Sequence, residues 1–182
     1  MFRLLMLHVG DSSYCTKLIK ASFMKQFRFL EGKLNEDFEL LLRMLMETEG
    51  IYQLERPGYN IVLRNMSNTR GVFRPIMYNA MIENSNTAYA MMEKSFPMYY
   101  LQAKRFWLYQ RLDYMLHIPV SMMNKDNEVC RGIIVDLKRN RKEIRTNPHL
   151  AKKEKRNLLI LSYAPKLSKR VHNVIMRLKG VF

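Results

Sequence analysis

The sequence SFPMYYLQAKRFWLYQRLDYMLHI, residues 95–118, does most to decide the fold. Ser95 and Pro97 suit the cap and first turn of a helix, and Pro119 limits where that helix ends. Aromatic residues recur on one helical face, which predicts a central buried helix, with a stacking platform for nucleic-acid bases as the alternative. The residues of that face are Phe96, Tyr99, Tyr100, Ala103, Trp107 and Tyr114. The other side carries Lys104, Arg105 and Arg111, which stay candidates for contact with a partner even if the helix is buried.

Before this segment, the sequence predicts two more helices. Asn35 is a candidate cap for a helix that ends by Gly50, with acidic residues in its first turn. Pro75 is expected to open a helix through about Met92, broken near 84–86. Residues 51–75 differ: they predict a turn at Pro57-Gly58, a strand over 59–64 and a polar loop over 65–71.

After this segment, the chain again favours helices. Residues 129–137 are either a strand or the start of a helix that continues through Arg145. Further helices are expected from Asn147-Pro148 to about Tyr163, and from Pro165 to a stop at Gly180. The predicted fold class is mainly α: an irregular helical bundle with one or two short strands and a basic helical C-terminal extension. A chain of 182 residues fits one domain with extensions.

Net charge is the unusual feature of the composition. The chain has 31 basic and 16 acidic residues, a formal net charge of +15, and a pI near 10.0. Residues 1–100 contribute only +2 (12 bases, 10 acids), whereas 137–182 contribute +12 (14 bases, 2 acids). A field of this strength favours an anionic partner: nucleic acid, an acidic membrane surface or an acidic protein. The predicted organisation is a packing body over 33–136 and a basic helical region over 137–182.

We expect the basic region to contact RNA phosphates. Lys152 and Lys153 fall early in a predicted helix, where cations oppose the helix dipole and where phosphate would remove the repulsion. The chain offers no base-reading motif, so contact would be electrostatic and salt-sensitive. The predicted RNA-binding residues are Lys138, Arg139, Arg141, Lys142, Arg145, Lys152, Lys153, Lys155, Arg156, Lys166, Lys169, Arg170, Arg177 and Lys179. A solvated basic face or linker is the alternative interpretation.

The last predicted helix has two distinct arcs. The apolar arc is expected to pack inward, and the basic arc to point outward with coherent positive charge. The apolar arc consists of Leu167, Val171, Val174, Ile175 and Leu178. The basic arc consists of Lys166, Lys169, Arg170 and Arg177.

The N-terminal segment, residues 1–32, is basic and rich in hydroxyl residues, and Asp11 and Glu31 are its acids. This profile is typical of a mitochondrial targeting segment, and the alternative is an amphipathic helix of the fold, capped by Asp11 or Ser12 and running to about Gly32. Two cysteines, Cys15 and Cys130, are too few for a disulfide framework and favour a reducing compartment, although one disulfide stays open.

Several function classes lack support in the sequence. Glycine-rich phosphate loops are missing, and the histidines are scattered without metal-ligand spacing, so we expect no cofactor, no metal and no small-molecule substrate. Asp113 and His117 lie four residues apart and are expected to touch on a helix surface rather than to catalyse. The longest charge-free run is 114–124, too short to cross a bilayer, which predicts a soluble or peripheral protein.

In composition, though in no aligned motif, the chain resembles the accessory proteins of mitochondrial ribosomes, which are small, basic and helical. That resemblance implies a non-catalytic, rRNA-binding structural component of the mitochondrial matrix, packed among rRNA and neighbouring proteins. The alternative is a peripheral accessory subunit of a mitochondrial membrane complex, whose basic face meets anionic lipid or acidic proteins.

Overall fold

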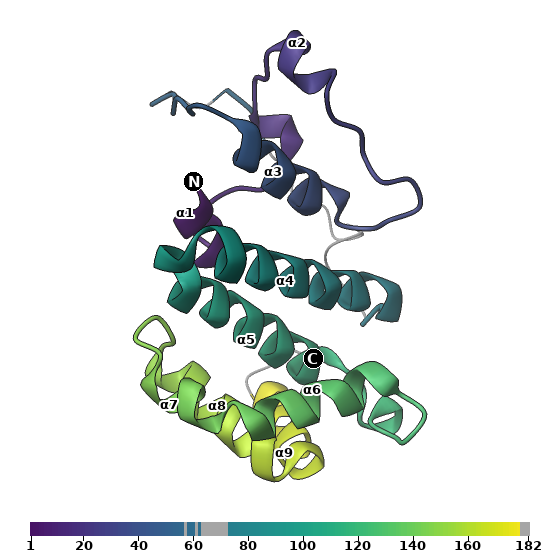
Figure 1. Ribbon diagram of the computed structural model, residues 1–182. Helices are drawn as coiled ribbons and strands as arrows, with labels where there is room; N and C mark the ends of the chain where they lie inside the picture. Colours follow the sequence, from purple (N-terminus) through teal and green to yellow (C-terminus); the bar gives the residue numbers. More distant parts are fainter. Residues whose placement is uncertain (57, 61, 63–72, 179–182) are drawn as a thin grey trace.

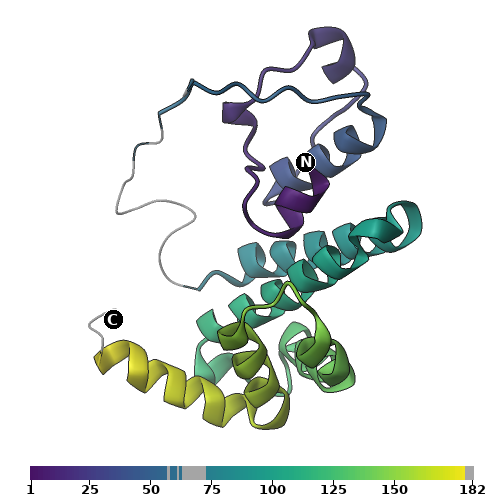
Figure 2. The same cartoon turned by 90° about the vertical axis from the view of Figure 1, so that its left-hand side faces the viewer.

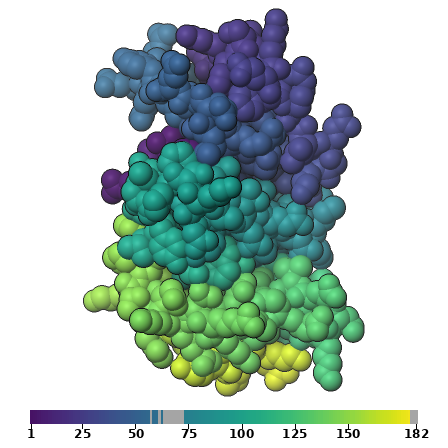
Figure 3. Space-filling view, in the orientation of Figure 1, coloured from purple at the N-terminus to yellow at the C-terminus, as the bar shows by residue number. Residues whose placement is uncertain are grey.

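The structure is a computed structural model that describes residues 1–182 except 57, 61, 63–72 and 179–182. The described residues are mainly helical, as predicted, and contain no strand. The helices stack in three layers (Figure 1), which the space-filling view shows as one continuous body (Figure 3). The first layer holds α1 (Phe2–Met6), α2 (Ala21–Met24) and α3 (Glu36–Glu47). The middle layer holds α4 (Pro75–Ser95) and α5 (Tyr100–His117). The third holds α6 (Glu128–Arg139), α7 (Arg141–Thr146), α8 (Lys152–Tyr163) and α9 (Pro165–Leu178).

Helix α5 is the centre of the molecule. It pairs with α4 through a single turn of 3₁₀ helix, Pro97–Tyr99, and ends just before Ile118 and Pro119, as the sequence predicts. Side chains all around its axis are buried, because α4 covers one side and the other layers cover the rest. The prediction of a central buried helix is therefore confirmed, and Trp107 and Tyr114 are core residues rather than a stacking platform.

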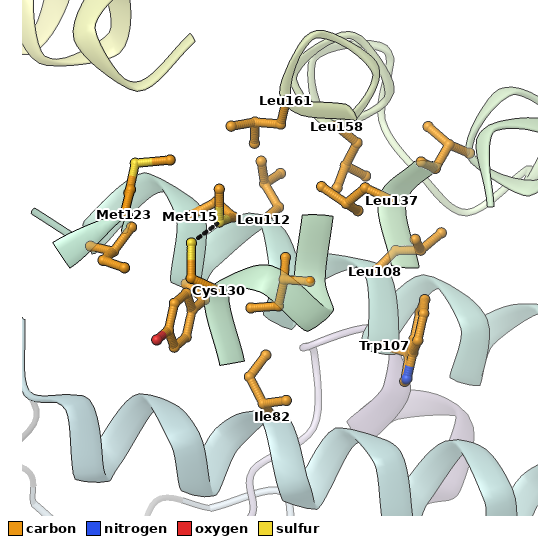
Figure 4. Packing of buried hydrophobic residues seen from close by; sticks show 14 of the residues in the cluster. Ile82, Trp107, Leu108, Leu112, Met115, Met123, Cys130, Leu137, Leu158 and Leu161 are labelled. Carbon is orange, nitrogen blue, oxygen red and sulfur yellow. Dashed lines mark hydrogen bonds between the residues drawn. The ribbon is translucent and has the colours of Figure 1, made fainter. Parts of the chain in front are cut away.

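One apolar core lies between α5 and the third layer (Figure 4). Leu112 and Met115 of α5 meet Leu158 and Leu161 of α8, with Leu137 of α6 beside them. The thiol of Cys130 lies 3.9 Å from the sulfur of Met115 within this cluster, and both Cys130 and Cys15 are free thiols. Fully burying each such apolar side chain contributes about 1.5–3 kcal/mol, so α6 and α8 are held to α5 mainly by this cluster.

A second core joins α5 to the first layer. Leu5 and Met6 of α1 pack with Leu42 of α3, Met92 of α4 and Phe106 of α5. The start of the chain is thus part of the packed fold. The single helix expected from about 11 to 32 is wrong.

Local hydrogen bonds explain why that helix does not form. The Asp11 carboxylate accepts from the Ser13 amide at 2.8 Å, and the Ser13 hydroxyl accepts from the Cys15 amide at 3.3 Å. Such side-chain bonds offer the backbone an alternative to the helix. Residues 14–16 form only a 3₁₀ turn, Tyr14–Thr16, and helical structure resumes briefly in α2.

The break expected near 84–86 does not occur, because α4 is continuous. Its three polar residues bind neighbours instead. The Asn84 amide donates to the Asn35 carbonyl at 2.9 Å, and the Ser85 hydroxyl donates to the Ile82 carbonyl at 2.7 Å. The Asn86 oxygen accepts from Trp107 Nε1 at 2.8 Å and so ties α4 to α5. These bonds satisfy the polar side chains of residues 84–86, which therefore do not interrupt the helix.

The boundaries of the other elements differ from prediction at several points. Residues 129–137 belong to α6, the helical alternative, which Asn127 caps by accepting from the Cys130 amide at 2.9 Å. The expected continuation through Arg145 is wrong, because α6 ends at Arg139 and α7 begins separately at Arg141. Helix α8 begins at Lys152 rather than at 147–148, because the Asn147 side chain accepts from the His149 amide in a turn. Helix α3 ends at Glu47 rather than near Gly50, and Asn35 occupies its N-cap position without a side-chain cap bond.

The insert between α3 and α4 is only partly described. Residues 59, 60 and 62 show no strand, so the predicted strand over 59–64 is wrong where it can be compared. The other residues of that predicted strand lie outside the described residues. The same holds for Pro57 of the expected turn, for the expected loop over 65–71 and for the expected helix stop at Gly180.

Candidate nucleic-acid interface

The predicted RNA-binding residues do not share one environment. Ten are exposed on the third layer: Lys138, Arg139, Lys142, Arg145, Lys152, Lys153, Arg156, Lys166, Arg170 and Arg177. We call these ten residues the basic face. Arg141 and Lys155 are half-buried, Lys169 is buried, and Lys179 lies outside the described residues. Within the described part of the chain, no member of the basic face forms an ion pair.

Two acidic residues of the third layer are turned away from the basic face. Arg105 Nη2 of α5 donates to Glu154 Oε1 of α8 at 3.1 Å. Arg111 Nε of α5 donates to Asp136 Oδ2 of α6 at 2.8 Å. Since these carboxylates are neutralised by α5, they do not offset the exposed lysines and arginines of α6 and α8.

Arg105 and Arg111 therefore do not reach a partner, although the sequence made them candidates for such a contact. Arg111 is 3% exposed, and its guanidinium lies 3.3 Å from the Trp107 ring centroid. Lys104 is also buried, with its ammonium 4.5 Å from the Trp107 ring centroid and 4.7 Å from that of Tyr89. Burial lowers the pKa of Lys104. All three side chains hold α5 in contact with neighbouring helices.

Arg141 also has a mainly structural role. Its Nε donates to the Ser162 hydroxyl at 2.9 Å and its Nη2 to the Ser162 carbonyl at 2.8 Å. These bonds fasten α7 to the last turn of α8, where backbone carbonyls lack helical partners. Its guanidinium lies 3.6 Å from the Tyr163 ring centroid, and Arg145 Nη2 lies 3.4 Å from the Tyr163 hydroxyl.

Tyr163 is a candidate contact residue that the sequence analysis missed. It is 61% exposed, between two arginines of α7. An exposed aromatic ring beside an exposed cation suits a nucleotide base, which stacks on the ring while Arg145 meets phosphate. The signal was weak in the sequence, because Tyr163 comes 18 residues after Arg145.

The first turn of α8 presents amides and cations together. Lys152 and Lys153 are its first two residues, and both are exposed. Glu154 Oε2 accepts from the Ala151 amide at 2.8 Å, so this carboxylate stabilises the helix start while its other oxygen binds Arg105. The unpaired amides of this turn and the two ammonium groups are complementary to phosphate.

Helix α9 differs from prediction in its apolar arc and in Lys169, whereas Lys166, Arg170 and Arg177 of the basic arc are exposed as predicted. Lys169 points inward, is 4% exposed, and donates to the Leu116 carbonyl near the end of α5, where a cation suits the helix dipole. The apolar arc faces outward instead of packing. The amphipathic pattern predicts that the arc is covered, but it cannot say whether the cover belongs to the same chain.

Two histidines lie in defined environments. Asp113 Oδ1 lies 3.3 Å from His117 Nδ1, as the spacing predicts, and this hydrogen bond raises the pKa of His117. Arg105 Nη1 donates to His8 Nδ1 at 2.7 Å, and desolvation, followed by the charge of Arg105, lowers the pKa of His8 to about 4. His8 is therefore neutral at pH 7. Because Nδ1 accepts from Arg105, the proton of the ring is on Nε2. The side-chain amide of Gln110 lies 3.1 Å from Nε2, and its oxygen is the atom that can accept this proton in a hydrogen bond.

Other kinds of site find little support in the described residues. No group of three or more His, Cys, Asp or Glu side chains there is placed to hold a metal ion. No described helix has the length and apolar character needed to cross a membrane. Comparison with protein-family models, curated proteins and solved structures finds no match to this chain.

Proposed function

We propose that this protein is a non-catalytic RNA-binding component of a large ribonucleoprotein, with rRNA as the expected partner of its basic face. The observation that carries this proposal is the charge arrangement of the third layer. Ten exposed cations lie there without carboxylate partners among the described residues, while Asp136 and Glu154 are paired with buried arginines. Unneutralised cations at this density favour a polyanion, because binding releases the ions condensed on its phosphates.

The structure of α7 and α8 suggests how RNA would lie. The two ends of α8 offer different chemistry: exposed lysines and free amides at its start, and Tyr163 between two arginines at its finish. A phosphate backbone that follows α8 would meet Arg156 between these ends. Recognition would depend on backbone and shape, since Tyr163 is the one exposed aromatic side chain among the described residues of α6 to α9.

Charge reversal on α8 tests the proposal. The triple variant Lys152→Glu, Lys153→Glu, Arg156→Glu changes the net charge by six units at three exposed positions. The control variant Arg3→Glu, Lys20→Glu, Lys25→Glu makes the same change on the first layer. Binding to an rRNA fragment is measured by filter retention at several salt concentrations. The first variant should lose most of the affinity, and its salt slope should fall by about 0.7–0.9 for each phosphate contact removed. Equal losses in both variants would disprove this location.

The mitochondrial ribosome is the assembly we propose, on the basis of the basic, hydroxyl-rich segment 1–32 and the small, basic, helical character of the chain. Tagged protein should co-sediment with a mitochondrial ribosomal subunit and be released from it by ribonuclease. Sedimentation apart from both subunits would refute this assignment.

One observation favours the alternative, a peripheral accessory subunit of a mitochondrial membrane complex: the apolar arc of α9 is exposed beside Arg170 and Arg177. Basic residues beside an exposed apolar stripe suit anionic lipid or an acidic protein. Under this alternative, co-migration in extracts survives ribonuclease and changes with detergent.

A further inference from the structure

The outer face of α9 is an exposed apolar surface that the proposed RNA contact does not use. Its five side chains are between 44% and 83% exposed. They are Leu167, Val171, Val174, Ile175 and Leu178. Single exposed apolar residues are ordinary on protein surfaces, but five on one helical face form a continuous stripe of the kind that marks an interaction site. The helix runs along the periphery of the molecule (Figure 2), so the stripe is accessible.

The stripe has the spacing of a coiled-coil seam. Four of its members are separated by four, three and four residues, the d–a–d–a order of two heptads: Leu167, Val171, Val174 and Leu178. In this register Arg170 and Arg177 both occupy the g position, which borders the seam on one side, and both are exposed. Ser168 and Ile175 occupy the e position on the other side. The seam therefore has a cationic edge and an uncharged edge.

The stripe cannot simply turn inward to find cover within the chain. Lys169, on the opposite side of α9, is fixed by its bond to the Leu116 carbonyl of α5. A shallow, mostly apolar hollow continues from the stripe past the start of α9, lined by Met123, Ile134 and residues 164–167. A helix longer than α9 would cover both the stripe and this hollow.

We propose that α9 docks an amphipathic helix of another protein, one with an apolar seam and acidic residues along the edge that faces Arg170 and Arg177. In coiled coils, charges that flank the seam select the partner, and two cations on one edge select carboxylates. This contact shares Arg170 and Arg177 with the basic face and differs from RNA binding by its use of the apolar stripe.

A second copy of this chain fits the seam poorly. In an antiparallel pair the g positions face each other, so Arg170 and Arg177 would oppose arginines. In a parallel pair g faces e of the partner, so Arg170 would oppose Ile175. Neither arrangement neutralises the guanidinium groups. A lipid surface also fits less well. Among the described residues of α9, the exposed basic side chains border one edge of the stripe, and the polar side of the helix is packed against α5 and α8, so it cannot flank the bilayer interface.

Two synthetic peptides of about four heptads test the proposal with the full chain, by fluorescence anisotropy and without RNA. Both have leucine at a and d; one carries glutamate at e and g, the other lysine. We expect the glutamate peptide to bind at least tenfold more tightly, and a glutamate peptide of shuffled order not to bind. Val174→Asp places a charge in the seam at an exposed position and should abolish binding while leaving the circular dichroism spectrum unchanged.

A charge swap separates specific docking from the general attraction of a basic protein for an acidic peptide. The variant Arg170→Glu, Arg177→Glu should reverse the preference in favour of the lysine peptide. The control Arg139→Glu, Lys142→Glu makes the same charge change away from the seam and should preserve the original preference. An unreversed preference would overturn the proposal. Failure of the glutamate peptide to bind would also overturn it if the chain instead associates with itself or binds phosphatidylserine vesicles. In that case Val174→Asp should abolish the self-association or the vesicle binding.

Discussion

Replacing Arg111 by methionine should be among the most destabilising single changes in the chain. This side chain sits at the point where α4, α5 and α6 meet. It donates to Asp136 Oδ2 at 2.8 Å, to Asn86 Oδ1 at 2.8 Å and to the Trp107 carbonyl at 3.1 Å. Burial lowers its pKa, whereas the hydrogen bond and charge of Asp136 raise it, and the guanidinium stays cationic at pH 7. Methionine keeps most of the length and the helix propensity but removes every one of these bonds.

The structure sets the expected magnitude. Removing one partner of a buried ion pair costs about 3–5 kcal/mol, because the other charge is left uncompensated. Two features place Arg111→Met at the lower end of that range. The Asp136 side chain is 31% exposed and can still reach water, and Asn86 Oδ1 keeps its bond to Trp107 Nε1. We expect a loss of about 3 kcal/mol in the free energy of unfolding, or roughly 6–12 °C in Tm for a chain of this size.

Removing the other partner of this ion pair should lower the free energy of unfolding by at least as much. Asp136→Asn leaves the guanidinium of Arg111 without its carboxylate, and the Arg111 side chain is only 4% exposed. The double variant Arg111→Met, Asp136→Asn should lose clearly less than the sum of the single losses, since the two groups share one interaction.

Urea denaturation followed by circular dichroism at pH 7 measures these losses. Arg131→Met is a matched control, because Arg131 pairs with Glu128 on the surface at 3.7 Å and should change stability by less than about 0.5 kcal/mol. The reasoning fails if Arg111→Met is as mild as this control, or if the double variant is additive.

Three further outcomes follow from particular contacts. Leu158→Ala should cost about 2–5 kcal/mol in urea denaturation, because Leu158 is fully buried in the core that joins α8 to α5; a loss below 1 kcal/mol would mean that this core does not hold α8. Folding lowers the pKa of His8 from its ordinary 6.5 to about 4, so the unfolded chain binds a proton at His8 more readily than the folded chain does. The contribution of His8 to the free energy of unfolding is therefore complete above pH 6.5 and is lost as the pH falls toward 4. His8→Asn, which suits the positive φ of 58° there, should flatten this acid slope in urea titrations at pH 7 and 5; the slope should stay modest because His8 keeps an exposed edge, and an unchanged slope would exclude His8 as its source. Lys169→Met should weaken rRNA-fragment binding less than Arg170→Met does in filter retention, because the ammonium of Lys169 is buried; equal losses would contradict that difference.

The sequence predicts much of the fold because helix limits are local. Pro75 and Pro165 begin α4 and α9 where predicted, since proline is favoured in the first turn, and α5 ends just before Pro119. Local signals failed where side chains satisfied the backbone in another way, as at Asp11 and Ser13, or where a polar group found a buried partner, as at Asn86.

The candidate interface was predicted only in part. The clustering of bases in the last quarter of the chain is visible in the composition, and ten of the fourteen predicted residues are exposed. Whether RNA binds them stays a prediction. The sequence did not separate Lys169 and Arg141, which bind backbone and hydroxyl groups inside the fold, from neighbours that face solvent. It also gave no reason to select Tyr163.

By itself, the sequence determined the helical class, the position of the central helix and the concentration of positive charge near the C-terminus. Periodicity and composition suffice for these, since each depends on residues close together in the chain. Only the tertiary structure decided which charges are neutralised and which face of α9 is open. The pairs Arg111–Asp136 and Arg105–Glu154 join residues 25 and 49 positions apart, and a helical pattern does not specify which neighbour each face meets. The outward charge of the third layer is therefore a property of packing, because α5 draws two carboxylates inward and leaves the cations exposed.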